Sequence, residues 1–299
     1  MKIFVWILLF LLVINVIAAL ITVFRKPRSI SSVLAWMMTL IFLPGIGFII
    51  YLFCGRGIDG QEVFKLSDDE KQMVQRIKEK VDIDNKKAGR DKRYDLLYDA
   101  KVLNRYFRNM DASPLAKRNS LQLFTDGQEK FQALFEDIRA AKETVHVEYY
   151  AFFNDTIGNQ FLDVLIEKLH EGVEVYLIYD PWGSPGANKK FFARYVDAGG
   201  KVAPFITSRD MIRKTRLNYH LHRKIVVIDG KIGWTGGFNV GDQYLNVTEK
   251  FGYWRDTHIR LVGTAVFSLQ EIFIMDWNAS VKYPEERMTY HEKYFKLPE

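Results

Sequence analysis

The residues with the clearest chemical potential lie in one short stretch, where His220, His222 and Lys224 occupy alternate positions. Side chains two apart on a β-strand point to the same side, so His222 and Lys224 should share a face. A neutral imidazole nitrogen can attack phosphorus and hold the group covalently, which replaces one difficult displacement by two easier ones. A lysine ammonium beside it would bind the non-bridging oxygens. These residue types therefore predict a site for a phosphate ester.

The residues after Lys224 predict a β-hairpin. Four apolar β-formers, residues 225–228, precede Asp229 and Gly230, and such a pair is a strong signal for a tight turn. With a two-residue turn, Ile228 would pair with Lys231 on the returning strand. The turn alone is enough to explain Asp229.

Counting back from this turn predicts which residues meet across the hairpin. Lys224 would lie opposite Thr235 and His222 opposite Gly237, with Asn239 just beyond the strand end. An imidazole, an ammonium and an amide would then converge, and the amide would supply neutral donors to a phosphate.

Two glycines, Gly236 and Gly237, complete the predicted phosphate-binding set with Lys224 and Asn239. A glycine leaves room for the backbone to approach a bulky anion closely.

The catalytic histidine also needs a partner on its second ring nitrogen, which fixes the tautomer. Asp256, at the start of another strand-like run, is the candidate for this role with His222. From spacing alone, His220 could be the nucleophile instead, and the two histidines could form half of a zinc site. No third ligand lies nearby and no acidic cluster has metal-binding spacing, so we infer no metal and no cofactor.

The whole pattern resembles the HKD signature of the phospholipase D superfamily. Its elements here are His222-x-Lys224-x4-Asp229, followed by Gly236-Gly237-x-Asn239. The resemblance implies that His222 is the nucleophile, that Lys224 and Asp229 belong to the catalytic motif, and that Asp256 hydrogen-bonds to His222. It also implies the fold of that superfamily, a mixed β-sheet flanked by helices.

The chain after residue 120 alternates between strand and helix patterns, which predicts an α/β fold with βαβ units and a sheet covered on both faces. The predicted strands are 121–124, 145–153, 173–179 and 202–205, and the predicted helices are 128–141, 159–170 and 188–198. Before them, a capping-box pattern begins at Ser67, and apolar residues recur at helical spacing through Val81.

Two hydrophobic runs open the chain, residues 3–24 and 33–53, and each is long enough to cross a bilayer as a helix. A cleaved signal peptide is the alternative for the first run. Pro44 and Gly45 interrupt the second, so it could bend or re-enter. The basic turn 25–29 and the basic residues after the second run favour opposite orientations of the chain in the membrane. The sequence leaves this orientation open. The net charge of +6 suits anionic lipid or nucleic acid.

Two such spans ahead of an HKD domain resemble bacterial cardiolipin synthases. The resemblance implies a multi-pass protein of the bacterial plasma membrane that joins two phosphatidylglycerol molecules into cardiolipin and glycerol, through a phosphatidyl-histidine. We expect a membrane anchor at 1–58, a polar connector at 59–112 and a catalytic half-domain at 113–280. Residues 281–299 would begin a linker to a second half.

The resembling enzymes carry two HKD motifs, whereas this sequence has one. We expect either an N-terminal fragment, which we favour, or a homodimer that pairs two half-sites across a two-fold axis. The alternatives are a membrane-tethered phosphodiesterase or nuclease and an inert truncated membrane protein. With membrane spans present, lipid is the nearest phosphodiester, so we expect no nucleic-acid partner.

Overall fold

The structure is a computed structural model. It describes residues 6, 10, 13, 17, 21, 29–43, 45–55, 66–88, 98–109, 115–205, 220–247 and 252–297. The chain forms two compact units, an N-terminal helical unit and a larger unit that contains the sheet. Each is described by itself.

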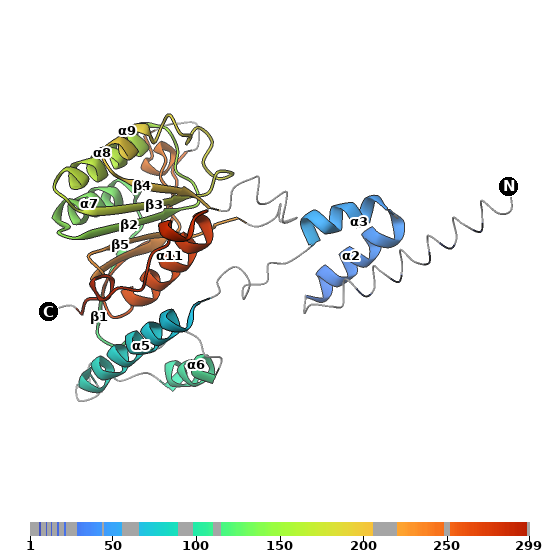
Figure 1. The fold of residues 1–299 in the computed structure, drawn as a ribbon, viewed down its shortest axis with the longest axis horizontal. Coiled ribbons are helices and arrows are strands. Elements are labelled where there is room, and N and C mark those ends of the chain that lie inside the picture. The colour runs from blue at the N-terminus through green and yellow to red at the C-terminus, as the bar shows by residue number, and fades with distance from the viewer. Residues whose placement is uncertain are drawn as a thin grey trace. The chain divides into compact units, whose positions relative to one another are not determined.

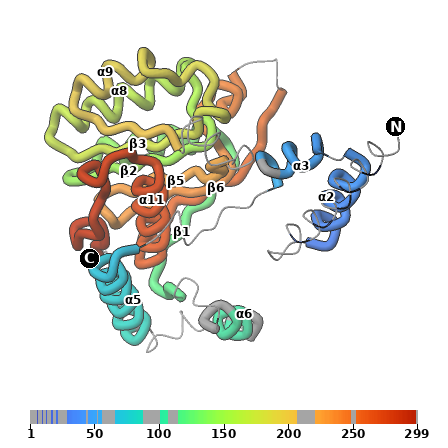
Figure 2. Tube along the Cα trace, turned by 45° about the vertical axis from the view of Figure 1, so that its right-hand side comes forward, coloured from blue at the N-terminus to red at the C-terminus, as the bar shows by residue number. Residues whose placement is uncertain are grey.

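The N-terminal unit contains α2 (Ile30–Phe42), α3 (Ile46–Ile50) and a single π-helical turn, η1 (Tyr51–Gly55). The side chain of Ser29 caps the start of α2 by accepting a hydrogen bond from the Ser32 N–H, 3.3 Å away. After α2 ends, Gly45 adopts a left-handed φ of 82°, which redirects the chain (Figure 2).

The helices α2 and α3 pack against each other. A side chain on Gly47 would lie 2.5 Å from the carbonyl oxygen of Thr39, so the glycine permits this close approach. Leu40 and Tyr51 are buried between the helices, and the Tyr51 ring meets that of Trp36 edge-on at 5.1 Å. The second hydrophobic run is therefore bent.

The prediction of two membrane-crossing helices is not confirmed. Among the described residues, no helix combines the length and the apolar character needed to cross a bilayer. The helix α2 has 13 residues, and the first hydrophobic run, residues 3–24, lies outside the described residues except for isolated positions.

The larger unit is built on a mixed sheet of seven strands within the described residues (Figure 1). The strands lie in the order β1-β7-β6-β5-β2-β3-β4; β2, β3 and β4 are parallel, and the remaining pairs are antiparallel. Their bounds are β1 (Asn119–Phe124), β2 (Thr144–Tyr149), β3 (Glu174–Tyr179), β4 (Lys201–Pro204), β5 (Lys224–Ile228), β6 (Ile232–Gly236) and β7 (His258–Gly263).

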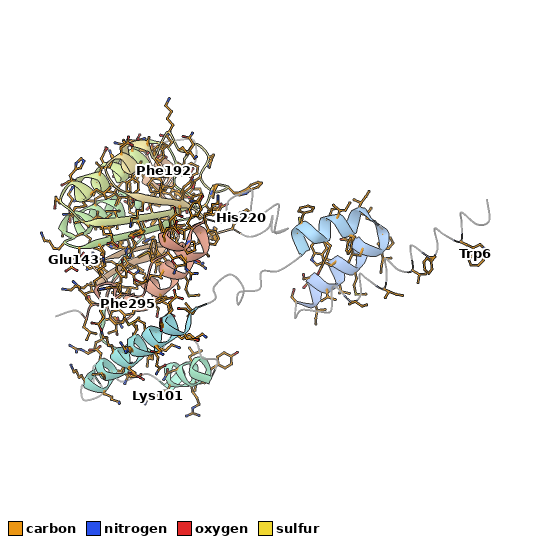
Figure 3. All side chains as sticks on the ribbon, in the orientation of Figure 1. Trp6, Lys101, Glu143, Phe192, His220 and Phe295 are labelled. Atoms are coloured by element: carbon orange, nitrogen blue, oxygen red, sulfur yellow. The ribbon has the colours of Figure 1, made fainter. Side chains whose placement is uncertain are left out.

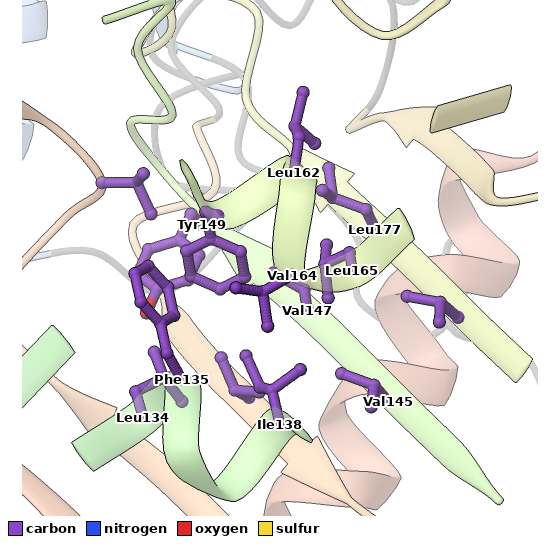
Figure 4. Close-up of a cluster of buried hydrophobic side chains, with 14 of the residues drawn as sticks. Leu134, Phe135, Ile138, Val145, Val147, Tyr149, Leu162, Val164, Leu165 and Leu177 are labelled. Carbon is purple, nitrogen blue, oxygen red and sulfur yellow. The ribbon is translucent and has the colours of Figure 1, made fainter. Parts of the chain in front are cut away.

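Helices cover both faces of this sheet (Figure 1). The helices α7 (Gly127–Ala140), α8 (Thr156–His170) and α9 (Ala193–Asp197) lie on one face, and α11 (Val266–Ser280) lies on the other. Val145, Val147 and Tyr149 of β2 point into the apolar core beneath α7 and α8 (Figure 4). The predicted βαβ order and the predicted strands and helices of this region are confirmed, with shifted bounds.

Outside the sheet lie two connector helices, α5 (Asp68–Ala88) and α6 (Tyr98–Asn109), and the short helices η3 (Asp242–Leu245), η5 (Pro284–Glu286) and η6 (Glu292–Tyr294). The predicted capping box is confirmed, because Ser67 and Glu70 exchange hydrogen bonds between backbone and side chain. Val74, Ile77 and Val81 form the buried face of α5.

The turn between β5 and β6 contains three residues, so the predicted two-residue turn is wrong. Ile228 pairs with Ile232, not with Lys231, and Ile225 pairs with Thr235. The whole returning strand is thereby shifted by one position.

The turn takes this form because its first residue is held to a third strand. Asp229 and Gly230 both adopt left-handed φ angles, 51° and 62°. The N–H of Asp229 donates to the carbonyl of Thr144 on β2, and the N–H of Lys231 donates to that of Ile228. Sequence counting along one hairpin could not include this contact.

Candidate active site

The candidate catalytic residues lie where β5 begins. Lys224, the first residue of β5, pairs with Tyr149 of β2. Extending the β5–β6 register by one residue sets Lys224 opposite Gly236, whereas the sequence predicted Thr235. By the same one-residue shift, His222 is no longer opposite Gly237, its predicted partner. His222 precedes the strand by two residues and is exposed to solvent.

Arg223, between these two residues, anchors the start of the strand on the opposite face. Its Nε lies 3.2 Å from Glu148 Oε1 and 2.7 Å from Asp276 Oδ2, and its Nη2 lies 2.5 Å from Asp276 Oδ1. Successive strand residues point to opposite faces. Because Arg223 is bound toward α11, His222 and Lys224 are directed to the other side.

The two carboxyl groups that bind Arg223 are both buried. Burial raises the pKa of Glu148 well above its usual value, and the neighbouring Asp276 carboxylate raises it further. Burial also raises the pKa of Asp276, but the Arg223 charge opposes this shift. Both carboxyl groups thus have a raised pKa, and Glu148 is the more readily protonated member of the pair.

His222 and Lys224 form the reactive pair. Lys224 Nζ lies 3.5 Å from His222 Nε2, and the ring of Tyr150 lies beside both, 4.9 Å from the imidazole and 5.4 Å from Nζ. The Lys224 charge, followed by partial burial, lowers the pKa of His222. The imidazole is thus kept neutral at neutral pH, which a nucleophile requires.

Lys224 itself is 3% exposed. Burial lowers its pKa, and the negative charge of Asp256 opposes that shift. Lys224 remains a suitable point charge for phosphate oxygens. Because it is already buried, it has less bound water to lose on binding them than a fully hydrated lysine has.

Two hydrogen bonds fix the amide of Asn239. Its Oδ1 accepts from the N–H of Ala151 at 3.1 Å, and its Nδ2 donates to the Tyr244 hydroxyl at 2.7 Å. Because Oδ1 is bound to a donor, the amide cannot rotate without losing both bonds. One N–H of Nδ2 remains available to a ligand.

Tyr244 is in turn held near the start of α8 by a pair of reciprocal caps. Asp155 Oδ2 accepts from the N–H of Asp242, 2.7 Å away, and the Asp242 carboxylate accepts from the N–H groups of Thr156 and Ile157. The short helix η3, which contains Tyr244, therefore begins at a residue bonded to α8.

The two glycines have a different explanation from the predicted one. A side chain on Gly237 would lie 1.8 Å from Asp256 Oδ1, and one on Gly236 would lie 2.5 Å from the Cα of His258. The N–H of Gly237 already donates to the carbonyl of Thr257. Both glycines thus make room for the residues that lead into β7, and their predicted part in binding a phosphate stays a prediction.

Asp256 lies near the reactive pair. Its Oδ1 accepts from the N–H of Thr257 at 2.6 Å, and its charge acts on Lys224. In the described part of the chain, no hydrogen bond joins Asp256 to His222. The predicted orienting role of Asp256 therefore stays a prediction.

Asp229 lies at the far end of β5 from the reactive pair. Its carboxylate accepts from the N–H groups of Lys142, Glu143 and Thr144, each at 2.8 Å. Seven residues of extended chain separate it from His222, which corresponds to roughly 23 Å. The structure gives Asp229 a role in holding the hairpin to the start of β2, and it places Asp229 away from the other candidate catalytic residues.

A buried lysine lies on the same sheet face as Lys224. Lys130 of α7 is fully buried, and its Nζ lies 2.9 Å from the Tyr149 hydroxyl and 3.6 Å from the ring centre of Phe131. Burial lowers the pKa of Lys130 well below its usual value, and that of His258 is lowered well below its own by burial and by the two lysines. Both shifts favour the neutral form of the group concerned.

The second histidine of the motif region has different neighbours. His220, labelled in Figure 3, lies with Nδ1 3.7 Å from Asp180 Oδ2 and its ring 5.8 Å from that of Trp182. Asp180 also accepts from the N–H groups of Leu221 and Trp182. The structure thus separates the two histidines: His222 adjoins Lys224, and His220 adjoins a buried carboxylate.

Sequence reasoning missed three residues of this site. Tyr150 lies in a predicted strand, but nothing in the sequence indicates its contact with His222. Arg223 was identifiable in principle, because a charged residue between two residues of one face must point to the other face. Asp276 lies in an apolar helical run far along the chain, and no local signal joins it to the motif.

Comparison with known proteins shows what the chain is similar to. Residues 134–266 match the family described as "Cardiolipin synthase, PLD-like domain", and residues 13–56 match "Phospholipase_D-nuclease N-terminal". A cardiolipin synthase of Listeria monocytogenes is 40% identical over 97% of this chain and 60% of its own length. One of Staphylococcus aureus is 40% identical over 95% of this chain and 57% of its own.

Among solved structures, NucT from Helicobacter pylori matches 56% of this chain and 100% of its own, with a TM-score of 0.43 and 18% identity. The chain spans about three fifths of the length of the curated relatives it matches. Its sheet domain, with the His222–Lys224 pair at the start of β5, is similar to the phospholipase D-like domain of cardiolipin synthases.

Proposed function

We propose that this chain carries one half of the active centre of a phosphatidyltransferase, which joins two phosphatidylglycerol molecules into cardiolipin and releases glycerol. The observation that carries the proposal is the exposed imidazole of His222, whose Nε2 lies 3.5 Å from the Lys224 ammonium and whose pKa is lowered by it. The name of the relatives, cardiolipin synthase, supports this choice of lipid.

The nucleophilic nitrogen follows from the contact with Lys224. If the ammonium donates to Nε2, that nitrogen carries a lone pair and the ring proton sits on Nδ1. The Asp256 carboxylate would accept from Nδ1–H and stabilise the ring in this orientation. Lys224 and the free N–H of Asn239 would bind the non-bridging oxygens.

The reaction would proceed in two displacements. The Nε2 lone pair of His222 attacks phosphorus of the first lipid, the N–P bond forms, and the bond from phosphorus to the glycerol oxygen breaks. That oxygen takes a proton from an acid on the opposite side of the phosphorus. The hydroxyl of a second phosphatidylglycerol then attacks the same phosphorus, the N–P bond breaks, and the hydroxyl proton returns to the group that lost one.

The acid opposite His222 would come from a second HKD half. The matched relatives are longer than this chain, which favours a second half within a longer protein, and a second copy of the chain is the other source. We also propose a multi-pass location in a bacterial plasma membrane. The hydrophobic runs, the net charge of +6 and the match of residues 13–56 support it.

The test is release of glycerol from phosphatidylglycerol by the full chain in mixed micelles, with a metal chelator present. The chain is assayed alone and with a polypeptide that carries a second HKD half from a relative. We expect release at least with the added half, its loss in His222→Ala, and its retention in the matched control His220→Ala. No release under either condition, or release that survives His222→Ala, would overturn the proposal. Cleavage of DNA that depends on His222, without lipid turnover, would favour the nuclease alternative.

A further inference from the structure

The segment that carries His222 is held by a hydrogen bond on either side of that residue. After it, the carbonyl of Arg223 accepts from the N–H of Tyr150 at 3.0 Å. Before it, the N–H of Leu221 donates to Asp180 Oδ2 at 2.7 Å. The first bond continues the pairing of β5 with β2. The second bond comes from a side chain that follows β3, and no step of the proposed reaction uses that side chain.

A side chain is needed before His222 because the strand β2 no longer offers a partner there. The β2–β5 register, continued past its last pair, would set Leu221 opposite Phe152. Phe152 instead forms a bridge with Val240, and its N–H donates to Ser184 Oγ at 2.9 Å. Leu221 is buried, and a buried backbone N–H needs an acceptor. The Asp180 carboxylate supplies this acceptor in place of the lost strand neighbour.

Asp180 is itself firmly placed. It is buried at the end of β3, and its own N–H donates to the carbonyl of Tyr149 at 3.2 Å. Its second oxygen, Oδ1, accepts from the N–H of Trp182 at 2.8 Å. His220 Nδ1 lies 3.7 Å from Oδ2, which is beyond hydrogen-bond distance. Two backbone N–H groups therefore fix the carboxylate, and the fixation does not require His220.

The same turn after β3 also holds Tyr150, whose ring lies 4.9 Å from that of His222. Ser184 Oγ donates to the carbonyl of Tyr150 at 3.1 Å. Gly183 packs against Tyr150 so closely that a side chain on it would lie 2.4 Å from the same carbonyl oxygen. Residues 180–184 therefore contact both the backbone that precedes the imidazole and the aromatic residue beside it.

We propose that Asp180 is a positioning residue for the nucleophile His222. By holding Leu221, it keeps the imidazole where Nε2 lies 3.5 Å from Lys224 Nζ. The inference rests on the proposed function for the role of His222, and Asp180 itself would touch neither the lipid nor the reacting phosphorus. A carboxylate suits this task, because it presents two acceptor oxygens and no donor to two N–H groups.

The test is the titration of His222, followed by NMR of the histidine rings in the detergent-solubilised chain. The signal of His222 is assigned by its loss in His222→Ala. The variants are Asp180→Asn, which turns a donor toward one of the two N–H groups, and Asp180→Ala, which removes both acceptors. The matched control is Asp137→Asn, which alters a partly buried carboxylate bound to Arg260 and Trp234 of the same sheet.

The direction of the pKa change separates position from charge. Lys224 lowers the pKa of His222 from close range, so an imidazole that has moved away should titrate at a higher pH. Loss of the Asp180 charge alone would lower the pKa of His222, because a nearby carboxylate favours the protonated imidazole. We expect this pKa to rise in both Asp180 variants, more in Asp180→Ala, and to stay unchanged in Asp137→Asn.

A pKa of His222 that stays at the wild-type value or falls in folded Asp180→Asn would overturn the inference. It would show that the rest of the site holds the imidazole without Asp180. Asp180→Asn decides alone where Asp180→Ala does not fold. Failure of both variants to fold would also overturn the inference, since the carboxylate would then serve the whole domain.

Turnover gives a second measure. Release of glycerol is assayed with the added second HKD half, and rates are expressed per folded molecule. We expect kcat to fall about tenfold to a hundredfold in Asp180→Asn with little change in KM, since a displaced nucleophile loses rate but not substrate contacts. An unchanged kcat, or an equal loss in Asp137→Asn, would overturn the inference. A wild type that releases no glycerol would refute only the proposed reaction, and the titration would still decide the role of Asp180.

Discussion

The buried pair Glu148 and Asp276 allows a quantitative prediction about the raised pKa of Glu148. The change is Glu148→Gln, which keeps the shape of the side chain, keeps an oxygen for Arg223 Nε and replaces the acidic O–H by an amide N–H. If Glu148 is neutral in the folded chain, this substitution removes no charge from the site. The variant should therefore fold and should retain the orientation of Arg223.

The magnitude follows from linkage between proton binding and folding. An acid whose pKa is raised on folding keeps its proton in the folded chain and releases it on unfolding. Folded stability is then lost as pH rises from the ordinary value of 4.5 toward the raised pKa. One proton corresponds to about 1.4 kcal/mol per pH unit. Glu148→Gln has no such proton. The unfolding free energy of the variant minus that of the wild type should therefore rise by about 1.4 kcal/mol for each unit of pH.

The assay is urea unfolding of the detergent-solubilised chain at several pH values between 5 and 8, followed by tryptophan fluorescence. The quantity compared is the difference in unfolding free energy between variant and wild type at each pH. A difference that does not change with pH, or one that changes in the opposite direction, would refute the assignment of the proton to Glu148. Arg223→Met is the comparison: it leaves buried acids without their cation and should cost about 3–5 kcal/mol.

Three further predictions concern single side chains. Asp229→Ala removes the acceptor of three backbone N–H groups and should lower the unfolding free energy by about 2–3 kcal/mol. Activity per folded molecule should stay unchanged. A selective loss of activity would instead indicate that Asp229 takes part directly in catalysis. Lys224→Gln should raise the pKa of His222, since the lysine charge is the main cause of its depression, and the titration of His222 followed by NMR would detect this. Lys130→Met should stabilise the chain, and more so at lower pH: a lysine whose folded pKa is lowered binds its proton more weakly in the folded chain, and this costs more as pH falls below its ordinary pKa. A urea series that shows destabilisation at every pH would contradict the lowered pKa of Lys130.

The sequence was sufficient for the elements that depend on local patterns. Alternating apolar runs and capping residues predicted the strands β2 to β6 and the helices α7 and α8, and the motif predicted that His222 and Lys224 lie together. The hairpin register failed because Asp229 bonds to residues 142–144, and that contact is not local. The length of a turn cannot be predicted from the sequence of one hairpin where a third strand forms hydrogen bonds with the turn.

The less predictable features all involve contacts between distant segments. The pairing of β1 with β7 joins residues more than 130 positions apart, as in Leu121 with Leu261. Asp276 binds Arg223 from a helix with no motif of its own. Gly237 was noticed in the sequence. The reason why a glycine is required there, the nearby carboxylate of Asp256, is visible only in the structure.

The reciprocal caps between Asp155 and Asp242 have a consequence for local motion. The hydroxyl that fixes the Asn239 amide belongs to η3, and η3 starts at a residue bonded to the first turn of α8. Opening of that turn would release both segments together, so the backbone amides of Ile157 and Asp242 should exchange hydrogen at one common rate. If Asn239 binds phosphate as proposed, opening of this helix end would release its amide, and bound phosphate should slow exchange at α8 without contacting that helix.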